Sequence, residues 1–362
     1  MQTRIPCVLM RGGTSRGPFF LASDLPADAA TRDAVLLAAM GSPHVLQVDG
    51  IGGGNTLTSK VAIISPSAEP GVEVDYLFAQ VAVDRGVVDT APNCGNMLAG
   101  VGPFAIESGL VPVRGETTTV TIRNRNTGAL VEALVRTPGG AVTYEGEAAI
   151  PGVPGTAAPV ELRFRQVAGA KTGRLFPTGA RIEEIQGVAV TLVDCAMPCM
   201  LLRAADVGTD AGASPSAIDG DRALLARLEA LRLEAGRRMG FGDVTDSVVP
   251  KVALLGPAPE GATLTARYLT PHAVHKAMAV TGGIAIATAA RIPGTVAHGL
   301  ARAEDGPVRL AHPSGVLEVP VALAGEEDVA WAGVLRTARR IFEGSLLIPA
   351  RIWAGHGLAR AA

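Results

Sequence analysis

The residue with the clearest chemical potential is Cys94, in the tetrapeptide Asn93-Cys94-Gly95-Asn96. The tetrapeptide follows a strand-like run, 76–83, and opens an apolar helix-like run, 97–106. Unpaired backbone N–H groups and the helix dipole favour negative charge at a helix N-terminus. A thiol placed there can serve as a proton carrier or a nucleophile, and Gly95 allows a ligand to approach the backbone. The alternative is a small, inert, buried cysteine in a helix cap.

Lys60 is the second candidate, at the start of the apolar strand-like run 61–64. Ser59 and Lys60 follow a glycine-rich loop, 50–55, that lacks the third glycine of a dinucleotide fingerprint and the closing Gly-Lys-Ser/Thr of a P-loop. We interpret the loop as a turn that can cradle an anion. A lysine that is partly desolvated at the mouth of a strand can act as a base near neutral pH. A surface lysine that extends to water is the alternative.

Arginine and hydroxyl side chains crowd the segment 11–17. Arg11, Thr14, Ser15 and Arg16 are separated only by glycines, and two guanidinium groups beside two hydroxyls can clamp a carboxylate. An ordinary polar loop is the alternative.

The histidines and cysteines do not predict a metal site. His272 and His275 have no third ligand at a suitable spacing, and the cysteines at 7, 94, 195 and 199 do not follow a zinc pattern. His272 remains a candidate for binding a substrate, with a structural histidine as the alternative. Free thiols favour a reducing, cytoplasmic location.

An internal repeat organises the chain. The run Thr281-Gly282-Gly283 opens a second helix-like segment, 284–292, as Cys94 opens the first, and a hairpin-like pattern follows each. The turn glycine Gly128 lies 34 residues after Cys94 (128 − 94), and Gly315 lies 34 after Thr281 (315 − 281). The pattern predicts two copies of one α+β unit, although strand–helix–hairpin order is common enough to arise by chance.

We expect each unit to be a curved, mostly antiparallel sheet around a central helix. The predicted domains are 1–184 and 185–344, and the C-terminal segment 345–362 can pack back on the first. Two such units can place two helix N-termini across a cleft, where N–H groups bind carboxylates. An exposed sheet edge would also make a homodimer plausible.

Composition excludes several classes of protein. The chain has 362 residues, 48% of them hydrophobic and 18% charged, with a net charge of −2. It carries no basic stripe of the kind that binds nucleic acid, and no apolar stretch is long enough to span a membrane. The N-terminus lacks the charged-then-apolar build of a signal peptide.

Together these segments resemble the family of 2-methylaconitate isomerases and 4-oxalomesaconate tautomerases or isomerases, within the diaminopimelate epimerase-like superfamily. The Leu57-Thr58-Ser59-Lys60 form and the long run 93–107 are most similar to the 4-oxalomesaconate branch. The resemblance covers nearly the whole chain, in segments 10–15, 49–53, 57–62, 74–78, 93–107, 136–140, 242–245 and 336–339.

The resemblance implies two tandem domains with a site in the cleft between them, no cofactor, and an acid–base pair that maps onto Lys60 and Cys94. The superfamily's epimerases carry a second cysteine at the second helix N-terminus, where this chain has Thr281. This departure argues against a symmetric two-thiol epimerase or racemase. Arg16 stands where the family often has lysine.

The reaction expected from the resemblance is the movement of a proton and a double bond in 4-oxalomesaconate, in the breakdown of gallate- or protocatechuate-type aromatics. Lys60 would remove a proton beside the keto group and Cys94 would deliver one at the far end of the allyl unit. The two roles can be exchanged, because coupled proton carriers are hard to assign individually. The expected substrate contacts are Arg11, Thr14, Ser15, Ser59, Asn93, Gly95, Asn96, His272, Thr281, Gly282 and Gly283.

Two rival functions stay open at this point. The first is the same chemistry on 2-methylaconitate or another unsaturated tricarboxylate. The second is a non-catalytic tricarboxylate-binding protein in which Lys60 and Cys94 are structural.

Overall fold

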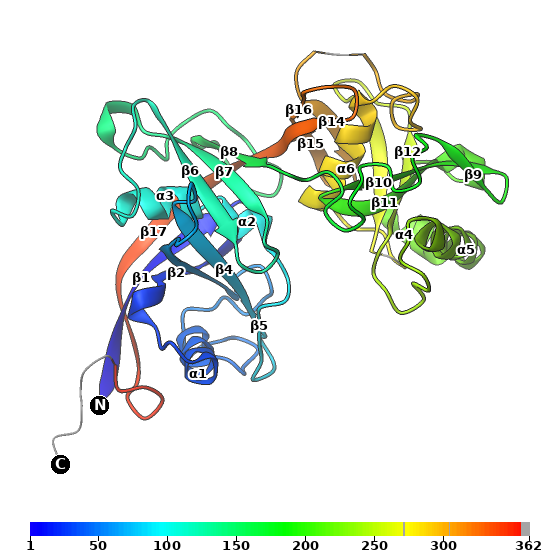
Figure 1. The fold of residues 1–362 in the computed structure, drawn as a ribbon. Coiled ribbons are helices and arrows are strands. Elements are labelled where there is room, and N and C mark those ends of the chain that lie inside the picture. The colour runs from blue at the N-terminus through cyan, green and yellow to red at the C-terminus, as the bar shows by residue number, and fades with distance from the viewer. Residues whose placement is uncertain (271, 304, 356–362) are drawn as a thin grey trace. The chain divides into compact units, whose positions relative to one another are not determined.

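The chain folds into two compact units, described here by a computed structural model that covers residues 1–270, 272–303 and 305–355 (Figure 1). Unit 1 comprises Met1–Arg163 and the described part of Leu335–Ala362, and unit 2 comprises Phe164–Val334. Residues 356–362 of the predicted C-terminal segment 345–362 lie outside the described residues. The part of that segment that is described belongs to unit 1.

Among its described residues, unit 1 is a mostly antiparallel sheet with three α-helices. Its strands pair in the order β1-β2-β3-β4-β6-β7-β8-β17, with β5 on β4, and β1 also pairs with β17. The β2–β3 and β4–β6 pairs are parallel. The elements are β1 (Gln2–Gly12), β2 (Ser15–Leu21), α1 (Ala29–Met40), β3 (Lys60–Pro66), β4 (Val74–Val81), β5 (Val88–Asp89), α2 (Gly95–Leu98), α3 (Val101–Glu107), β6 (Thr117–Asn124), β7 (Leu130–Arg136), β8 (Pro159–Phe164) and β17 (Val329–Pro349).

Side-chain alternation gives the unit 1 sheet two apolar faces. Val61, Ile63, Ala79 and Val81 pack with α1 in one buried cluster. The opposite face contacts α2 and α3, which touch β1, β2, β3, β6 and β7. Because successive strand residues point to opposite faces, the continuous apolar runs of β3 and β4 serve both layers.

Unit 2 repeats this plan. Its sheet order is β15-β14-β13-β12-β11-β10-β9, and β16 pairs with the first residues of β17. The elements are β9 (Glu183–Ile185), β10 (Val188–Cys195), β11 (Met197–Arg203), α4 (Pro215–Gly220), α5 (Arg222–Arg238), β12 (Lys251–Gly256), β13 (Leu264–Leu269), α6 (Val280–Arg291), β14 (Val308–His312), β15 (Gly315–Val319) and β16 (Val321–Leu323). Short 3₁₀ turns occupy Ala22–Asp24, Pro138–Gly140 and Ala204–Val207.

The strand directions of the two units correspond one by one. The parallel pair β11–β12 matches β2–β3, and the parallel pair β13–β14 matches β4–β6. The antiparallel hairpin β14–β15 matches β6–β7. This correspondence agrees with the predicted α+β fold of two tandem, pseudo-symmetric units.

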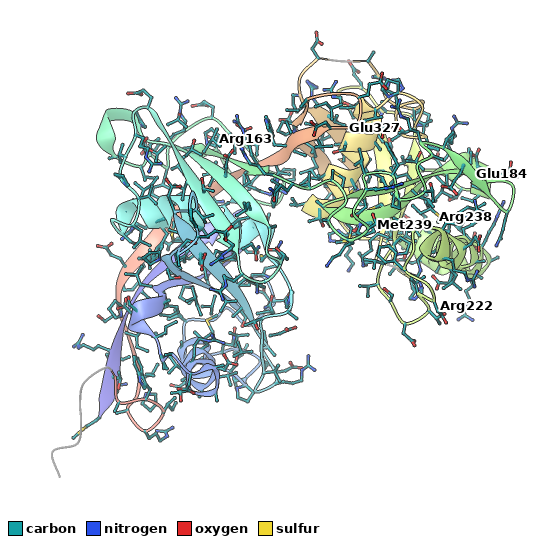
Figure 2. The ribbon with its side chains drawn as sticks, viewed as in Figure 1. Arg163, Glu184, Arg222, Arg238, Met239 and Glu327 are labelled. Carbon is teal, nitrogen blue, oxygen red and sulfur yellow. The ribbon has the colours of Figure 1, made fainter. Side chains whose placement is uncertain are left out.

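Two helices cover the faces of the unit 2 sheet. Leu224, Leu228 and Leu231 of α5 pack on one face, while α6 contacts β10, β11, β14 and β15 on the other. Arg238, labelled near the end of α5 in Figure 2, donates to the Glu183 carboxylate and to the carbonyl oxygen of Glu184 in β9, at 2.8 and 2.9 Å.

The division between the units differs from the expected boundary at 184/185, because the segment 164–184 is hydrogen-bonded to β10. Asp194 accepts bonds at 2.7 Å from the backbone nitrogens of Lys171 and Thr172. Ala168 also bridges to Cys195. These contacts attach 164–184 to the second sheet, and the chain returns to unit 1 at Leu335 rather than at 345.

Candidate active site

Lys60 begins β3 and lies beside polar and aromatic partners on β4. Its ammonium donates to Oε1 of Gln80 at 2.7 Å and stands 5.0 Å from the ring centroid of Phe78. Gln80 is directly opposite Lys60 in the strand pair. The Gln80 side-chain nitrogen donates to the carbonyl oxygens of Ser59 and Thr56, at 2.8 and 3.2 Å. Those two bonds orient the Gln80 oxygen toward the amine.

Cys94 is held over the same face of β4. The hydroxyl of Tyr76 donates to the Cys94 carbonyl oxygen at 3.3 Å. Burial, with a smaller contribution from Cys94, raises the pKa of Tyr76 well above its ordinary value, so the phenol stays protonated and can donate. Tyr76 and Phe78 are two residues apart on one strand, so their side chains share a face. The strand β4 therefore contacts both candidate proton carriers.

The hairpin between β1 and β2 packs against the residues around Cys94. A Cβ on Gly12 would lie 2.4 Å from the carbonyl oxygen of Asn96, and a Cβ on Gly13 would lie 2.3 Å from its side-chain oxygen. The Asn96 side chain donates to the Thr14 hydroxyl at 3.0 Å. The predicted contacts Thr14 and Asn96 are thus neighbours, and the two glycines permit the close approach.

Gly17 connects this hairpin with Lys60. A Cβ on Gly17 would lie 1.8 Å from the Lys60 carbonyl oxygen and 3.2 Å from Cε of Met97 in α2. Ser15, Gly17 and Phe19 are two residues apart along β2, so they lie on the same face of the strand. That face is directed toward α3, because the Phe19 ring lies 5.7 Å from the ring of Phe104. Ser15 is 1% exposed, and its hydroxyl makes no hydrogen bond with the described residues. It is a free donor on the face that carries Lys60.

The helix after Cys94 is shorter than expected. The run 97–106 forms two helices, α2 of four residues and α3 of seven. The break falls at Gly100, where a Cβ would lie 2.6 Å from the Phe19 ring. Cys94 is the N-cap residue of α2, as expected, but a single helical turn carries a smaller dipole than a long helix.

Three predicted contacts have partners within the protein. Arg11 donates to Gly13 and Thr337 oxygens at 2.9 to 3.1 Å, which ties the hairpin to β17. Ser59 is fully buried between Gln47 and the Val81 carbonyl oxygen. Asn93 is exposed and accepts a bond from Asn124 at 2.7 Å. Arg11 and Ser59 therefore have structural bonds that a substrate would have to replace.

The glycine-rich loop has a packing role. A Cβ on Gly52 would lie 2.2 Å from the Gln47 side-chain oxygen, and a Cβ on Gly50 would lie 2.2 Å from the Gly41 nitrogen. The Gln47 oxygen also accepts from the Gly54 backbone at 3.0 Å. The loop wraps around Gln47 and the end of α1, and its glycines allow that approach.

The remaining predicted residues belong to unit 2. Helix α6 begins at Val280, one residue before Thr281, so Thr281, Gly282 and Gly283 lie in its first turn. A Cβ on Gly282 would lie 2.2 Å from the Tyr268 ring. His272 is exposed, and its Nδ1 lies 3.6 Å from the Glu229 carboxylate of α5. The structure brings the α6 residues against Tyr268, and places His272 beside α5.

The other cysteines differ from Cys94 in their surroundings. All four are free thiols. Burial raises the pKa of Cys7, which packs in the α1 cluster. Burial also raises the pKa of Cys195 to about 12, although the Thr288 hydroxyl lowers it. Within the described ranges, no three His, Cys, Asp or Glu side chains are grouped to hold a metal ion, and no helix has the length and apolar character needed to cross a bilayer.

Sequence reasoning missed two residues of unit 1, Gln80 and Tyr76, and one residue of unit 2, Lys251. Gln80 and Tyr76 gave no signal, because their importance comes from strand pairing with β3 and from contact with Cys94. Lys251 did have a signal. It opens Lys251-Val252-Ala253-Leu254-Leu255, which echoes Lys60-Val61-Ala62-Ile63-Ile64 at the matching strand of the other unit.

Comparison with known proteins identifies close relatives. The family model described as PrpF protein matches residues 2–349. The chain is 49% identical over 357 residues to the 4-oxalomesaconate tautomerase of Pseudomonas putida, covering 98% of this chain and 99% of the relative. It is 47% identical over 346 residues to the (4E)-oxalomesaconate Delta-isomerase of Novosphingobium sp. (strain KA1), covering 95% and 97%.

A solved structure is similar over the full length. The crystal structure of a methylitaconate-delta-isomerase has a TM-score of 0.92 and 38% identity, and the match covers 100% of both chains. The 3-methylitaconate isomerase of Eubacterium barkeri is 39% identical over 372 residues, covering 96% of this chain and 98% of the relative. These matches confirm the family and the fold that the motifs predicted.

Proposed function

The chain belongs to the PrpF protein family, and from that premise we propose that it is a cofactor-independent isomerase of 4-oxalomesaconate. The reaction moves a proton and a double bond, as a 1,3-allylic shift or a keto–enol tautomerisation. Two relatives named for this compound share 47% and 49% identity over nearly the whole chain, which supports the choice of substrate.

The observation that carries the proposal is the shared face of β4. Phe78 lies under the Lys60 amine and Tyr76 holds the Cys94 carbonyl oxygen. Residues two apart on a strand are separated by about 7 Å. An amine and a thiol supported by one rigid strand can act on two carbons of one small acid, because proton transfer requires stable positioning of both groups.

The proposed reaction begins when the neutral Lys60 amine takes a proton from the carbon beside the keto group. The electron pair left by that C–H bond delocalises as a dienolate. The Cys94 thiol then gives its proton to the far carbon of the allyl unit, and the double bond moves. The ammonium and the thiolate that remain return to their starting forms by exchange with water.

Hydrogen-bond donors near Cys94 are proposed to stabilise the dienolate and the carboxylates. Ser15 offers an unpartnered buried hydroxyl, and Thr14 and Asn96 lie beside it at the hairpin. The backbone N–H groups of Gly95 and Asn96 lie in the first turn of α2. Donors fixed before the reaction stabilise developing charge without reorganisation. His272, Thr281, Gly282 and Gly283 remain predicted substrate contacts from unit 2.

The test compares variants of the two proton carriers with matched controls. Each positioned acid or base supplies about 10²–10⁴-fold in rate, so Lys60→Met and Cys94→Ser should each lower kcat/KM by that factor in an ultraviolet assay of 4-oxalomesaconate. The controls are Lys171→Met, an exposed lysine, and Cys7→Ser, a buried cysteine on the α1 face, which should leave kcat/KM unchanged. Near-normal rates in both Lys60→Met and Cys94→Ser would show that the assignment is wrong, and tight substrate binding with no turnover in the unmodified protein would identify a binding protein instead.

A second candidate substrate class has its own support. The full-length structural match is a methylitaconate-delta-isomerase, and a 2-methyl-aconitate isomerase of Shewanella oneidensis shares 36% identity over 387 residues. The same proton carriers could act on these unsaturated acids. The ratio of kcat/KM values across 4-oxalomesaconate, 2-methylaconitate and 3-methylitaconate separates the candidates, and the first should be the best substrate.

We further propose that the enzyme works in the cytoplasm, in the breakdown of gallate- or protocatechuate-type aromatics, and as a homodimer. The free thiols support a reducing compartment. Light scattering of the purified protein tests the dimer.

A further inference from the structure

Unit 2 contains a cavity of about 370 Å³ that the proposed function does not use. Its walls come from the loop before α4, the loop after β12, and the strands β13 and β14. Among the lining residues are Asp210, Gly212, 257–259, Thr265, Arg267 and His312. Sites for small molecules typically have volumes of about 300–1,000 Å³, so the cavity is large enough for one small metabolite.

The cavity lies on the face of the unit 2 sheet that is opposite to α6. On β13, Leu269 packs in the α5 cluster, and Arg267 and Thr265 share its face because they are two and four residues away. Thr265 pairs with Ala311 of β14, which also lines the cavity. Tyr268 points the other way, against the first turn of α6. The sheet therefore separates the cavity from the predicted substrate contacts of α6.

One wall of the cavity carries a buried positive charge. Arg267 is 7% exposed, and its guanidinium donates at 2.8 to 3.1 Å to three backbone carbonyl oxygens, those of Gly212, Ala213 and Ala266. These bonds fix the plane of the guanidinium, but the acceptors are uncharged and do not neutralise it. Burial lowers the pKa of Arg267, and the attraction of Asp210 opposes that effect. A guanidinium has five N–H groups, so one on each terminal nitrogen can still donate to a molecule in the cavity.

A carboxylate lies on the same lining. Asp210 is exposed, and its Oδ1 accepts from the Gly212 backbone nitrogen at 2.6 Å, which fixes the side chain in its turn. The Gly212 carbonyl oxygen accepts from Arg267, so the loop 210–213 holds an acid and a base at neighbouring points of the cavity. A molecule with only negative charge would be attracted by Arg267 and repelled by Asp210, whereas a zwitterion can satisfy both.

The rest of the lining is mostly apolar. The loop 257–259 supplies two proline rings and an alanine methyl group, and Ala311 adds a second methyl group. The Thr265 hydroxyl donates to the Pro257 carbonyl oxygen at 2.7 Å, so toward a ligand it can act only as an acceptor. These walls favour a short aliphatic group on the ligand, next to a group that donates hydrogen bonds.

We propose that this cavity binds a small α-amino acid with a short aliphatic side chain. The α-carboxylate accepts from the Arg267 guanidinium, the α-ammonium donates to the Asp210 carboxylate and the Thr265 hydroxyl, and the side chain lies against the loop 257–259. A buried charge-assisted bond contributes more than an exposed one, so Arg267 provides most of the affinity and Asp210 the preference for a zwitterion. The inference is independent of the proposed function, because none of these residues belongs to the proton-transfer site.

The test observes the cavity from His312, one of its lining residues. The chain has six histidines, so ¹³C-histidine labelling gives six imidazole Cε1–H signals in an NMR spectrum, and His312→Asn identifies the one from the cavity. Three ligands of matched shape are titrated into the full-length protein: L-valine, isovalerate, which lacks the ammonium, and isobutylamine, which lacks the carboxylate. L-valine should shift the His312 signal in a saturable way. Isovalerate should bind about fivefold more weakly, and isobutylamine about 10- to 100-fold more weakly.

A variant of the exposed acid distinguishes recognition of a zwitterion from general anion binding. Asp210→Asn keeps an oxygen acceptor for the Gly212 nitrogen but removes the charge, so it should abolish the preference for L-valine over isovalerate. Asp243→Asn is the control, because Asp243 accepts in the same way from the Thr245 backbone nitrogen, at 2.9 Å, and lies outside the cavity lining. The proposal is overturned if L-valine does not move the His312 signal, if Asp210→Asn retains the preference, or if inorganic phosphate binds more tightly than L-valine.

Discussion

At the scale of single residues, the amide of Gln80 has a fixed orientation, with its oxygen toward the Lys60 amine. Its nitrogen is committed to two backbone oxygens, so its oxygen accepts from Lys60. A neutral acceptor holds the amine in place without adding a charge that would keep it protonated. Gln80 is therefore expected to be a positioning residue for the base.

This role predicts a pH effect. In Gln80→Glu a carboxylate replaces the amide 2.7 Å from the amine, and an opposite charge so close favours the ammonium over the neutral amine that the proposed reaction uses. The variant should have a lower kcat/KM at neutral pH, and the loss should become smaller as the pH rises.

Gln80→Leu is the control for that measurement, since it removes the same backbone contacts without adding charge. Its kcat/KM can fall, but its pH–rate profile should keep the wild-type midpoint. An unchanged pH–rate profile in Gln80→Glu would show that Gln80 does not influence the base.

Residue type and local context were enough to predict where two of the candidate residues lie in the fold. Cys94 was predicted at a helix start and Lys60 at a strand start, and both lie there. Arg11 was predicted as a clamp from its neighbours alone. Its actual acceptors on Thr337 are 326 residues away, and no local pattern carries that information.

At the scale of elements, Gly17 controls how closely β2 approaches Lys60. Gly17 has no positive φ, so the constraint is steric: a Cβ would meet the Lys60 carbonyl oxygen at 1.8 Å. A contact that short cannot be accommodated without a backbone shift, and misplacement of a catalytic group by about 1 Å can cost 10²-fold.

Gly17→Ala should therefore lower kcat/KM by about 10²-fold and lower the thermal midpoint of unfolding. Gly86→Ala is the matched control, because Gly86 has no positive φ and no atom within 4 Å of its Cβ position. The control should be neutral or slightly stabilising. Wild-type rates in Gly17→Ala would mean that the β2–β3 junction does not set the position of Lys60.

Most elements follow from local pattern, and the exceptions have long-range causes. The hairpin-like pattern expected after the first helix-like run is present as β6–β7. The single helix expected over 97–106 is broken where Gly100 meets the Phe19 ring. That contact joins residues 81 positions apart (100 − 19), so the break is invisible to periodicity.

At the scale of the whole molecule, the duplicated topology was predictable, whereas the division between units was not. Equal spacing of helix starts and turn glycines indicated two copies, and strand directions match between the sheets. The segment 164–184 belongs to unit 2 because Asp194 accepts from Lys171 and Thr172. The segment itself gives no sign of this attachment, because the Asp194 carboxylate lies 23 residues from Lys171 along the chain.

Removing the Asp194 carboxylate should loosen the attachment of residues 164–184 to unit 2. Asp194→Ala deletes three hydrogen bonds to one carboxylate oxygen, and the loss of charged hydrogen bonds costs roughly 1.5–3 kcal/mol. Trypsin should then cleave faster at Lys171 and Arg174. Asp243→Ala is the control, since that carboxylate bonds only within its own turn, to Thr245. Equal cleavage rates in the wild type and Asp194→Ala would contradict this account of the boundary.

Deuterium exchange in D₂O, followed by ¹H NMR of 4-oxalomesaconate, tests the central claim most directly, because it observes each proton transfer separately. With Lys60 as base and Cys94 as acid, Cys94→Ser should still exchange the proton beside the keto group while forming product at least about 10²-fold more slowly. Lys60→Met should neither exchange nor isomerise. Exchange and isomerisation at wild-type rates in Lys60→Met would contradict the account.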